Sequence, residues 1–398
     1  MTPKRFMLIA GEASGDVLAA ELVVELRAAF FRRRTYSTDV QPVQSDLAPR
    51  FFGAGGPRMA AAGVELSLNL VQHSMVGIPG PKEYLKFTRF FDELFALAVE
   101  RQPHVIILVD FNKFNLDFAA AVKKHIRVRK HTFNNWNPKI VKYVSPQVWA
   151  SRENRAYQIA RDFDLLLTIF PFEKAWYAAT VPRLHVEYVG HPMMDRYQGM
   201  ALPAESPDAA PLLVLLPGSR PLELKRHLPP MLAALKIIRA AQPNLRARMI
   251  LPSRTLLDLA AKFPPPADLE LRCGGLPESL AQADLAIAKT GTITMECAYF
   301  GVPTVTLYIT SLVEFQIGKR LVKVEYLTMP NLLAGDAIFP EFLQSQATPE
   351  NLARATLELL RDTSRREKVR ARLKEIIASL GGPGAPSRAA AAILKIVP

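Results

Sequence analysis

Phe6-Met-Leu-Ile-Ala-Gly-Glu-Ala-Ser-Gly-Asp16 is an apolar run that stops at a glycine-bearing turn, and Leu212-Leu-Val-Leu-Leu-Pro-Gly-Ser-Arg220 repeats this pattern in the second half of the chain. A helix-like pattern follows each turn. A buried parallel strand that leads through a small-residue loop into a helix leaves backbone N–H groups free to bind a phosphate. The sequence therefore predicts two nucleotide-type α/β halves with a cleft between them.

Strand-like apolar runs alternate with helix-like patterns along the whole chain, which is typical of parallel sheets built from strand–helix–strand units. We expect strands at 6–10, 105–110, 139–145, 164–170, 212–216, 247–251, 285–288 and 304–308. The Pro- and Ala-rich stretch 201–211 lacks either periodicity and predicts a linker. We therefore expect an N-terminal Rossmann-like domain over 1–200, a C-terminal Rossmann-like domain over 212–345, and further helices over 346–398.

The composition is that of a large globular enzyme. The 398 residues are comfortable for two domains and long for one core. No apolar run reaches the ~18 residues that a membrane span needs. Glu12 and Asp16 interrupt the first apolar run too early for a signal peptide, so we expect a core strand there. Cys273 and Cys297 show no metal-ligand spacing, which fits a reducing cytoplasm.

The charge balance points to an anionic partner. Lys and Arg number 50 against 37 Asp and Glu, a formal net charge of +13. Such a balance favours nucleic acid, acidic lipid or a phosphorylated substrate. Basic residues cluster at 32–34, 123–130 and 319–323, although each cluster alone is more often a solvated face. Aromatic residues do not interleave with them, and no zinc finger or basic zipper occurs, so we expect no nucleic acid partner.

Several further motifs follow one another in order. They are Phe114-Asn-Leu116, Tyr143-Val-Ser-Pro-Gln-Val-Trp-Ala-Ser-Arg152, Phe170-Pro-Phe-Glu-Lys174, Val189-Gly-His-Pro192, Lys289-Thr-Gly-Thr-Ile-Thr-Met-Glu-Cys297, Lys319-Arg-Leu-Val-Lys323 and Leu327-Thr-Met-Pro-Asn-Leu-Leu-Ala-Gly335. Together with the two glycine-bearing turns, they make the chain resemble the lipid-A-disaccharide synthase family from about residue 6 to residue 344. The resemblance is specific, because so many multi-residue motifs seldom fall in sequence by accident.

The resemblance implies a GT-B fold, in which two Rossmann-like domains with parallel sheets face each other across a cleft. It implies an inverting transfer from UDP-2,3-diacylglucosamine to 2,3-diacylglucosamine 1-phosphate, with a β-1,6-linked disaccharide 1-phosphate and UDP as products and no cofactor. The implied place is the cytoplasmic face of the inner membrane, where an anionic surface suits the positive charge. The C-terminal helices either pack back on the N-terminal domain or are exchanged in a homodimer.

Asp110 is our candidate for the general base. It closes the apolar run from Val105, and α/β enzymes place reactive groups at the carboxyl ends of such strands. An Asp there also commonly caps the following turn. The matching residue of the family is the proposed base, which favours the catalytic reading. The family commonly has a second Asp three residues later, where this chain has Lys113.

We expect UDP to bind the second half of the chain. Arg220 follows a Pro-Gly-Ser turn at a predicted helix start, where a diphosphate would contact backbone N–H groups beside a guanidinium. Glu296 is our candidate for binding the ribose hydroxyls of UDP, because a carboxylate in this region of GT-B enzymes has that role. No His, Cys and carboxylate cluster has metal-ligand spacing, so we expect Arg220, Lys289 and loop amides to stabilise the leaving group without a metal ion. The full predicted UDP set is Gly218, Ser219, Arg220, Lys289, Thr290, Gly291, Thr292, Glu296, Tyr308 and Asn331.

The first half is expected to contact the acceptor or the sugar. His191 either caps the turn after Gly190 or lines the cleft. Ser151 stands where the family usually has Trp, while Trp149 and Arg152 keep the pattern. The predicted set for this side is Gly11, Glu12, Ser14, Gly15, Asp16, Asn115, Ser145, Trp149, Arg152 and His191.

Large apolar side chains with lysines and an arginine between them follow His73, the composition of an interfacial amphipathic segment. The predicted lipid-facing residues are Met75, Val76, Ile78, Tyr84, Phe87 and Phe91. An aromatic helix with this period is more often part of a core, so partial burial is the competing interpretation.

Two other functions remain open at this point. One is a UDP-N-acetylglucosamine 2-epimerase-like enzyme, or another GT-B enzyme with a soluble substrate. The other is a nucleotide- or lipid-binding protein without catalysis, which only Lys113 suggests. An apolar segment around Phe87–Phe91 favours a lipid substrate over the first of these.

Overall fold

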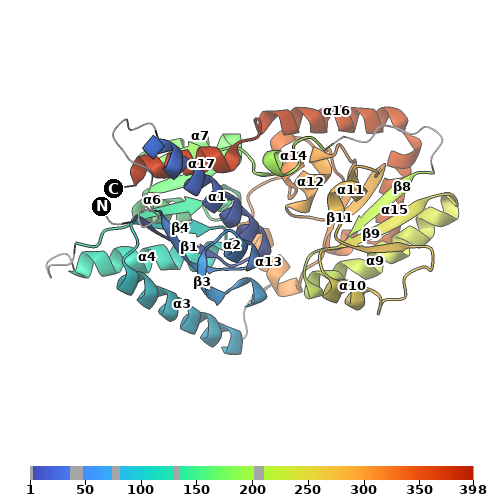
Figure 1. Ribbon diagram of the computed structural model, residues 1–398. Coiled ribbons are helices and arrows are strands. Elements are labelled where there is room, and N and C mark those ends of the chain that lie inside the picture. The colour runs from blue at the N-terminus through green and yellow to red at the C-terminus, as the bar shows by residue number, and fades with distance from the viewer. Residues whose placement is uncertain (1–2, 36–47, 74–80, 130–134, 201–209, 398) are drawn as a thin grey trace. The chain divides into compact units, whose positions relative to one another are not determined.

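The computed structural model describes residues 3–35, 48–73, 81–129, 135–200 and 210–397. The chain divides into two compact units (Figure 1), of which unit 1 comprises Met1–Arg196 with Leu380–Pro398 and unit 2 comprises Tyr197–Ser379. Each unit contains one parallel sheet with helices packed on it. Two Rossmann-like units with parallel sheets confirm the predicted fold class.

The sheet of unit 1 has seven parallel strands in the order β3-β2-β1-β4-β5-β6-β7. The order reverses between β1 and β4, which makes their carboxyl ends the topological switch point where α/β proteins bind ligands. The strands are β1 (Arg5–Ala10), β2 (Arg50–Gly55), β3 (Glu65–Asn69), β4 (Val105–Val109), β5 (Lys139–Tyr143), β6 (Leu165–Thr168) and β7 (Val186–Tyr188).

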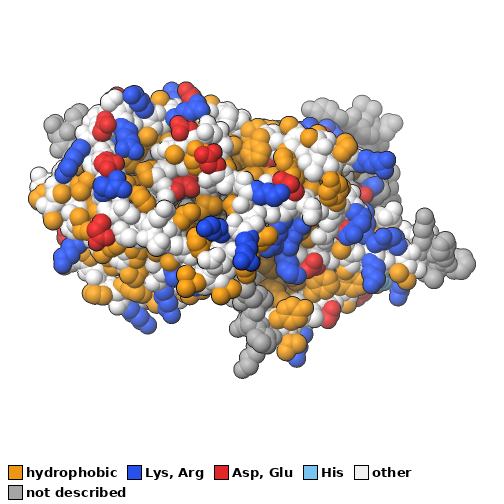
Figure 2. Space-filling view, turned by 180° about the vertical axis from the view of Figure 1, so that it is seen from behind, with side chains coloured by type: hydrophobic (Ala, Val, Ile, Leu, Met, Phe, Trp, Pro, Cys, Tyr) orange, Lys and Arg blue, Asp and Glu red, His pale blue; other side chains and the backbone are white. Residues whose placement is uncertain are grey.

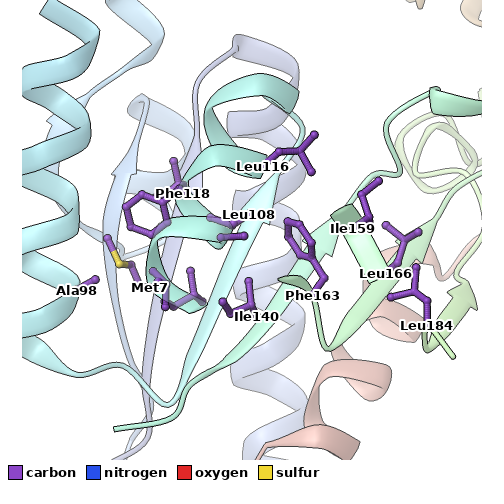
Figure 3. Close-up of a cluster of buried hydrophobic side chains, with 14 of the residues drawn as sticks. Met7, Ala98, Leu108, Leu116, Phe118, Ile140, Ile159, Phe163, Leu166 and Leu184 are labelled. Carbon is purple, nitrogen blue, oxygen red and sulfur yellow. The ribbon is translucent and has the colours of Figure 1, made fainter. Parts of the chain in front are cut away.

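Helices connect the strands and pack on this sheet. Figure 3 shows side chains of the core beneath them, among them Met7 of β1, Leu108 of β4 and Phe118 of α4, all fully buried. The helices are α1 (Ala13–Thr35), α2 (Pro57–Ala61), α3 (Pro81–Arg101), α4 (Asn112–Arg129), α5 (Val148–Ser151), α6 (Arg155–Asp162), α7 (Pro171–Thr180), α8 (Met193–Arg196) and α17 (Ala385–Ile396), with the 3-10 helix η2 (Val71–His73).

The last helix, α17, packs on α1 at the opposite end of the sequence. Its approach is fixed by hydrogen bonds: the Tyr188 hydroxyl donates to the Leu380 carbonyl at 2.6 Å, and the Asp195 carboxylate accepts from the Ala385 amide at 3.0 Å. Arg388 of α17 donates from Nε to the Val189 carbonyl at 2.7 Å. These contacts assign residues after Leu380 to unit 1.

The sheet of unit 2 has six parallel strands in the order β10-β9-β8-β11-β12-β13, with its switch point between β8 and β11. The strands are β8 (Leu212–Leu216), β9 (Arg246–Leu251), β10 (Glu270–Cys273), β11 (Leu285–Lys289), β12 (Thr304–Tyr308) and β13 (Glu341–Leu343). The helices are α9 (Pro221–Ala241), α10 (Arg254–Ala260), α11 (Leu276–Leu280), α12 (Ile293–Tyr299), α13 (Leu312–Leu321), α14 (Met329–Ala334), α15 (Pro349–Arg361) and α16 (Thr363–Ser379), with the 3-10 helix η3 (Gln344–Gln346).

All eight predicted strands are present, although β4, β5 and β6 end at Val109, Tyr143 and Thr168, one or two residues before the predicted ends. Five strands were not predicted: β2, β3, β7, β10 and β13. The interior strand β2 contains Gly53 and Gly55, and the others are short and only partly buried. Of the helices in the described ranges, none has the length and apolar character needed to cross a membrane.

Candidate active site

The β4–α4 turn carries Asp110 at the switch point of unit 1. Asp110 and Phe111 both have left-handed backbones, with φ of 46° and 44°. Two consecutive residues other than glycine in this region cost about 1–3 kcal/mol each and persist only where the surroundings hold them. Here the side-chain amide of Asn115 donates to the carbonyls of Val109 at 3.1 Å and Asp110 at 2.9 Å. The Asp110 amide donates to the Tyr143 carbonyl at 3.0 Å.

Lys113, which replaces a carboxylate of the family pattern, does not contact Asp110 through its ammonium group. Its Nζ forms an i,i+4 ion pair with Asp117 at 2.8 Å on the exposed face of α4. Asn115, by contrast, is fully buried under the turn that it supports. The structure therefore gives Asn115 the role of holding the Asp110 turn.

The loop after β1 lies against this turn. A Cβ atom on Gly11 would come within 2.4 Å of the Phe111 ring, so only glycine permits this close approach. Ser14 is exposed, whereas Asp16 is buried and its carboxylate accepts hydrogen bonds from the amides of Gly56, Arg58 and Met59 at 2.8–3.0 Å. Asp16, in the first turn of α1, thus caps α2, and a Cβ atom on the neighbouring Gly15 would lie 3.6 Å from that of Asp110.

The segments after β5 and β6 form a buried polar cluster that the sequence only partly revealed. Glu173 accepts hydrogen bonds from Nε1 of Trp149 at 3.1 Å and from the Phe170 amide at 3.2 Å. Burial raises the pKa of Glu173 to about 7. Ser145 is buried beside it and donates to the Tyr177 hydroxyl at 3.1 Å. Glu173 lies in a quoted motif, but nothing in that pattern marked it as buried.

Two other predicted residues of unit 1 differ in exposure. Arg152 is exposed after α5. His191 lies against the Phe170 ring, with the ring centroids 5.4 Å apart, and accepts a hydrogen bond at Nδ1 from the Met193 amide at 3.3 Å. Burial lowers the pKa of His191 to about 4, and the charge of Arg196 acts in the same direction. The imidazole is therefore neutral at pH 7 and caps the turn before α8.

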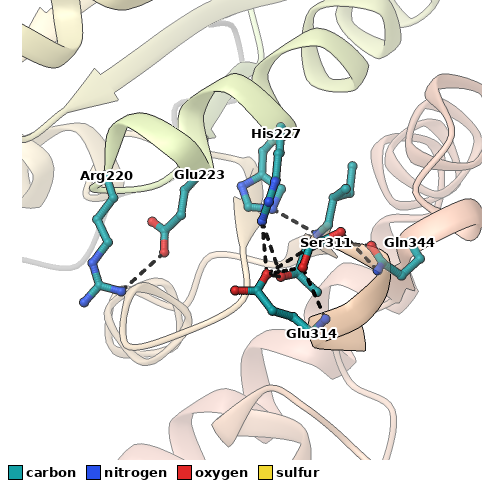
Figure 4. A network of polar contacts seen from close by, with 9 residues as sticks. Arg220, Glu223, His227, Ser311, Glu314 and Gln344 are labelled. Atoms are coloured by element: carbon teal, nitrogen blue, oxygen red, sulfur yellow. Dashed lines mark hydrogen bonds and ion pairs between the residues drawn. The ribbon is translucent and has the colours of Figure 1, made fainter. Parts of the chain in front are cut away.

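In unit 2, the Pro-Gly-Ser turn ends at Arg220, the N-cap residue of α9. The Glu223 carboxylate accepts a hydrogen bond from the Ser219 amide at 3.1 Å. It also lies 3.7 Å from Arg220 and 3.1 Å from Lys289 at the end of β11, and Figure 4 shows the pair that Arg220 makes with it. A carboxylate on this amide and between two cations shows that the turn can bind anionic oxygens.

His227 connects this turn to the end of β12. It is buried, with Nδ1 3.1 Å from the Pro217 carbonyl and Nε2 accepting from the Ile309 amide at 3.0 Å. Burial lowers its pKa, and these partners fix a neutral ring with the proton on Nδ1. The neighbouring network in Figure 4 is closed by Glu314, whose pKa is lowered to about 2 by hydrogen bonds from Thr310 and Ser311. Nothing in the sequence pattern signalled either residue.

The remaining predicted UDP residues lie on the loops after β11 and β12 and on the helices beside them. Gly291, with φ of 140°, precedes α12, and its carbonyl accepts the Thr294 hydroxyl at 2.7 Å. Tyr308 ends β12 with Lys289 Nζ 5.8 Å above its ring. Glu296 accepts the Tyr197 hydroxyl at 3.0 Å. Thr290 is buried and Thr292 precedes the first residue of α12.

Asn331 is a buried residue of α14 that reaches β13. Its amide nitrogen donates to the Phe339 carbonyl and to Glu341, both at 2.8 Å, and its oxygen accepts the Phe339 amide at 2.8 Å. These bonds give the side chain a structural task. Its predicted place beside the nucleotide stays a prediction.

Most of the predicted residues lie near the carboxyl ends of strands. Those of unit 1 follow β1, β4 and β5, and those of unit 2 lie at or after the ends of β8, β11 and β12. His191 instead follows β7, and Asn331 lies on α14. Met75, Val76 and Ile78 lie outside the described residues. Within the described ranges, no group of three or more His, Cys, Asp or Glu residues is arranged to hold a metal ion.

Two Rossmann-like units with polar residues at both switch points define the GT-B class. Solved structures with the same fold include the glycotransferase of kitacinnamycin, with a TM-score of 0.61, 18% identity and full coverage of both chains. The calicheamicin glycosyltransferase gives a TM-score of 0.58 at 17% identity, again over both whole chains. A UDP-N-acetylglucosamine 2-epimerase gives 0.55 at 13% identity, over 99% of this chain and 96% of that one. At these identities the likeness concerns the fold.

Sequence relatives narrow the class to one family. The family model described as lipid-A-disaccharide synthetase matches residues 6–396. A lipid-A-disaccharide synthase from Anaeromyxobacter dehalogenans (strain 2CP-C) is 36% identical, over 99% of this chain and 97% of the relative. One from Trichlorobacter lovleyi is 34% identical, over 99% and 98%. The chain belongs to the lipid-A-disaccharide synthase family and is a glycosyltransferase of the GT-B fold, which confirms the resemblance drawn from its motifs.

Proposed function

We propose that this glycosyltransferase moves the 2,3-diacylglucosamine group of UDP-2,3-diacylglucosamine to the 6-hydroxyl of 2,3-diacylglucosamine 1-phosphate. The proposal rests on the Asp110 turn, which lies at a switch point and is held by hydrogen bonds from Asn115. It also rests on the match to the synthase family over residues 6–396. The epimerase-like alternative has support from the fold alone.

In the proposed reaction the acceptor oxygen attacks C1 of the donor sugar while the Asp110 carboxylate takes its proton. The bond between C1 and the UDP oxygen breaks, and its electron pair leaves with UDP. Attack from the side opposite the leaving group inverts the configuration at C1. Asp110 ends the step protonated and returns the proton to solvent.

Unit 2 would hold UDP. The Ser219 amide, Arg220 and Lys289 would offer three donors to the diphosphate, and their contacts with the Glu223 carboxylate support this role. Charge that develops on the departing diphosphate would be stabilised by the two cations. Glu296, which already accepts a hydroxyl from Tyr197, would accept those of the ribose.

Unit 1 would contact the acceptor, and exposed apolar residues of both units would contact the lipid surface. The acceptor would lie beside Asp110 and the end of β1 leading into α1, with Gly11, Glu12, Ser14 and Gly15. Tyr84 and Leu85 of α3 are 62% and 61% exposed, and in unit 2 Leu312 and Val313 of α13 are 77% and 64% exposed. Figure 2 shows Lys and Arg side chains spread among apolar ones over the visible face. Basic and apolar groups together suit an anionic membrane surface, and we place the protein on the cytoplasmic face of the inner membrane.

The test is release of UDP from UDP-2,3-diacylglucosamine, measured with and without acceptor, together with analysis of the sugar product. The transferase predicts acceptor-dependent UDP release and a disaccharide 1-phosphate. An epimerase would change the sugar without needing the acceptor, and a non-catalytic binding protein would release no UDP. A homodimer formed by exchange of the C-terminal helix would use the contacts that α17 makes with α1. Light scattering would distinguish the mass of such a dimer from that of the monomer.

A further inference from the structure

A lysine lies inside the sheet of unit 1, next to the Asp110 turn. Lys142 of β5 is 0% exposed. It pairs in register with Leu108 of β4 and with Leu166 of β6, both of which belong to the apolar core. Leucine would complete that row, and a buried ammonium group is costly unless it has a partner. The presence of lysine therefore needs an explanation.

The partner is the turn itself. Lys142 Nζ donates to the carbonyl oxygen of Asp110, the same oxygen that accepts the side-chain amide of Asn115 at 2.9 Å. A carbonyl oxygen has two lone pairs, so these two donors saturate it. The peptide group that follows Asp110 is thereby fixed. Among the described residues other than glycine, Asp110 and Phe111 are the only two neighbours that both have left-handed backbones.

The charge of Lys142 is matched to the same residue. Burial lowers the pKa of Lys142 to about 8, and the Asp110 carboxylate is the charge that opposes this effect. The ammonium form therefore predominates at neutral pH. The positive charge of Lys142 therefore lies at the backbone carbonyl of the residue proposed as the base.

We propose that Lys142 is a positioning residue for Asp110: its ammonium group holds the left-handed turn and balances the carboxylate, so that the base keeps one direction. This role rests on the proposed function of Asp110. Lys142 does not reach the substrate in this scheme. It acts through the backbone and the charge of its neighbour.

The variant Lys142→Met removes the charge and keeps the length of the side chain. We expect kcat to fall by about 10- to 100-fold, the range for a misplaced catalytic group, with unchanged affinity for UDP in calorimetry. Lys123→Met is the matched control. Lys123 is a partly buried lysine of the same unit, 2.9 Å from Asp164 at the start of β6. Its loss should lower the melting temperature and leave kcat within about 2-fold.

A second comparison separates positioning from general destabilisation. In an Asp110→Asn background, Lys142→Met should lower kcat by less than about 2-fold, because the group that Lys142 positions is already gone. If Lys142→Met does not fold, Lys142→Gln is used under the same criteria. If the wild type is active and the Lys142 variant keeps its kcat, this role of Lys142 is overturned while the proposed function stands. The same holds if Lys142→Met lowers kcat by the same factor in the Asp110→Asn background as in the wild type. A wild type that releases no UDP overturns the proposed function, and this role with it.

Discussion

Asp110 and Asp117 are two carboxylates near the start of α4 with different surroundings. Asp110 follows a held left-handed turn, whereas Asp117 makes an exposed ion pair with Lys113. Asp110→Asn keeps the size of the side chain and removes the base, so we expect turnover to fall by about 10²-fold or more with little change in UDP affinity. Asp117→Asn loses only a surface ion pair and should stay near wild type. Near-wild-type turnover of Asp110→Asn would reject the assignment.

Glu173 should make the stability of unit 1 depend on pH. Its pKa is raised from 4.5 to about 7 in the folded state, so the folded protein keeps a proton that the unfolded chain has lost between these values. The stability that this bound proton gives the folded state is therefore fully present below pH ~4.5 and is lost as pH rises through ~7. Relative to wild type, Glu173→Gln should gain stability between pH 5 and 8, by up to about 3 kcal/mol.

Urea unfolding followed by tryptophan fluorescence measures this, because Trp136, Trp149 and Trp176 all lie in unit 1. Glu65→Gln is the control in the same unit. The hydrogen bond from Arg101 lowers the pKa of Glu65, so its contribution to stability is lost only in acid and its variant should keep a constant difference from wild type between pH 5 and 8. A pH-independent difference for Glu173→Gln would contradict the proposed protonation.

Single residues show how far the sequence could predict the site. The position of Asp110 after a buried strand could be predicted because an apolar run ends there, and the Pro-Gly-Ser turn because a glycine followed by a helix start is visible in the sequence. The roles of these residues stay predictions. Lys142 and Glu173 were missed, since both sit in segments where the pattern gives no sign of burial for a charged residue. Asp16 was predicted on the loop after the first strand, whereas it lies in the first turn of α1, and its bonds to α2 depend on a strand, β2, that the sequence did not reveal.

The elements that were predicted and those that were missed differ in burial. Predicted strands such as β4 and β8 are buried along their whole length, and such continuous apolar runs stand out in a sequence. The missed β3 and β13 lie at the edges of their sheets with no fully buried residue. An edge strand can be short and mixed in polarity because one side has no partner strand. Hydrophobic pattern therefore predicts sheet centres better than sheet edges.

Helix α3 combines both interpretations offered for it. Phe91 packs against Phe114 and Phe118, with ring centroids 5.4 and 5.6 Å apart, while Tyr84 and Leu85 are exposed. We expect Phe91→Ser to lower the free energy of unfolding of unit 1 by about 2 kcal/mol or more. The double variant Tyr84→Ser/Leu85→Ser should leave the melting temperature nearly unchanged and weaken binding to anionic vesicles.

Vesicle sedimentation and a thermal melt on both variants decide the matter. Unchanged vesicle binding of the Tyr84/Leu85 variant would remove α3 from the proposed lipid surface. A large loss of stability in that variant would instead mean that these side chains are covered in solution.

At the scale of the molecule, composition and contacts place the boundary between the two units at different residues. Composition indicates a linker at 201–211, whereas the contacts divide the fold after Arg196. Tyr197 already belongs to unit 2, because its hydroxyl bonds Glu296 at 3.0 Å and the Tyr299 hydroxyl donates to its carbonyl at 2.7 Å. The return of Leu380 and α17 to unit 1 depends on hydrogen bonds to Val189 and Asp195, which no local pattern displays.

The net charge of +13 gives a prediction for the whole protein. Affinity for vesicles rich in anionic phospholipid should fall by about 10-fold or more between roughly 0.05 and 0.5 M salt, since each basic group near the surface contributes ~1 kcal/mol that salt screens. Vesicles of zwitterionic lipid should bind weakly at both concentrations.

Paired charge reversals test whether this attraction is spread over the molecule or has a location. Lys319→Glu/Arg320→Glu on α13 and Lys368→Glu/Lys374→Glu on α16 change the net charge equally. The first pair is exposed on the helix that also exposes Leu312 and Val313, whereas none of the large exposed apolar residues lies on α16. Because lipid contact needs apolar and basic groups together, we expect the α13 pair to reduce vesicle binding several-fold more than the α16 pair. Equal losses would mean that net charge alone governs the attraction, and no loss in either would contradict an electrostatic contact with lipid.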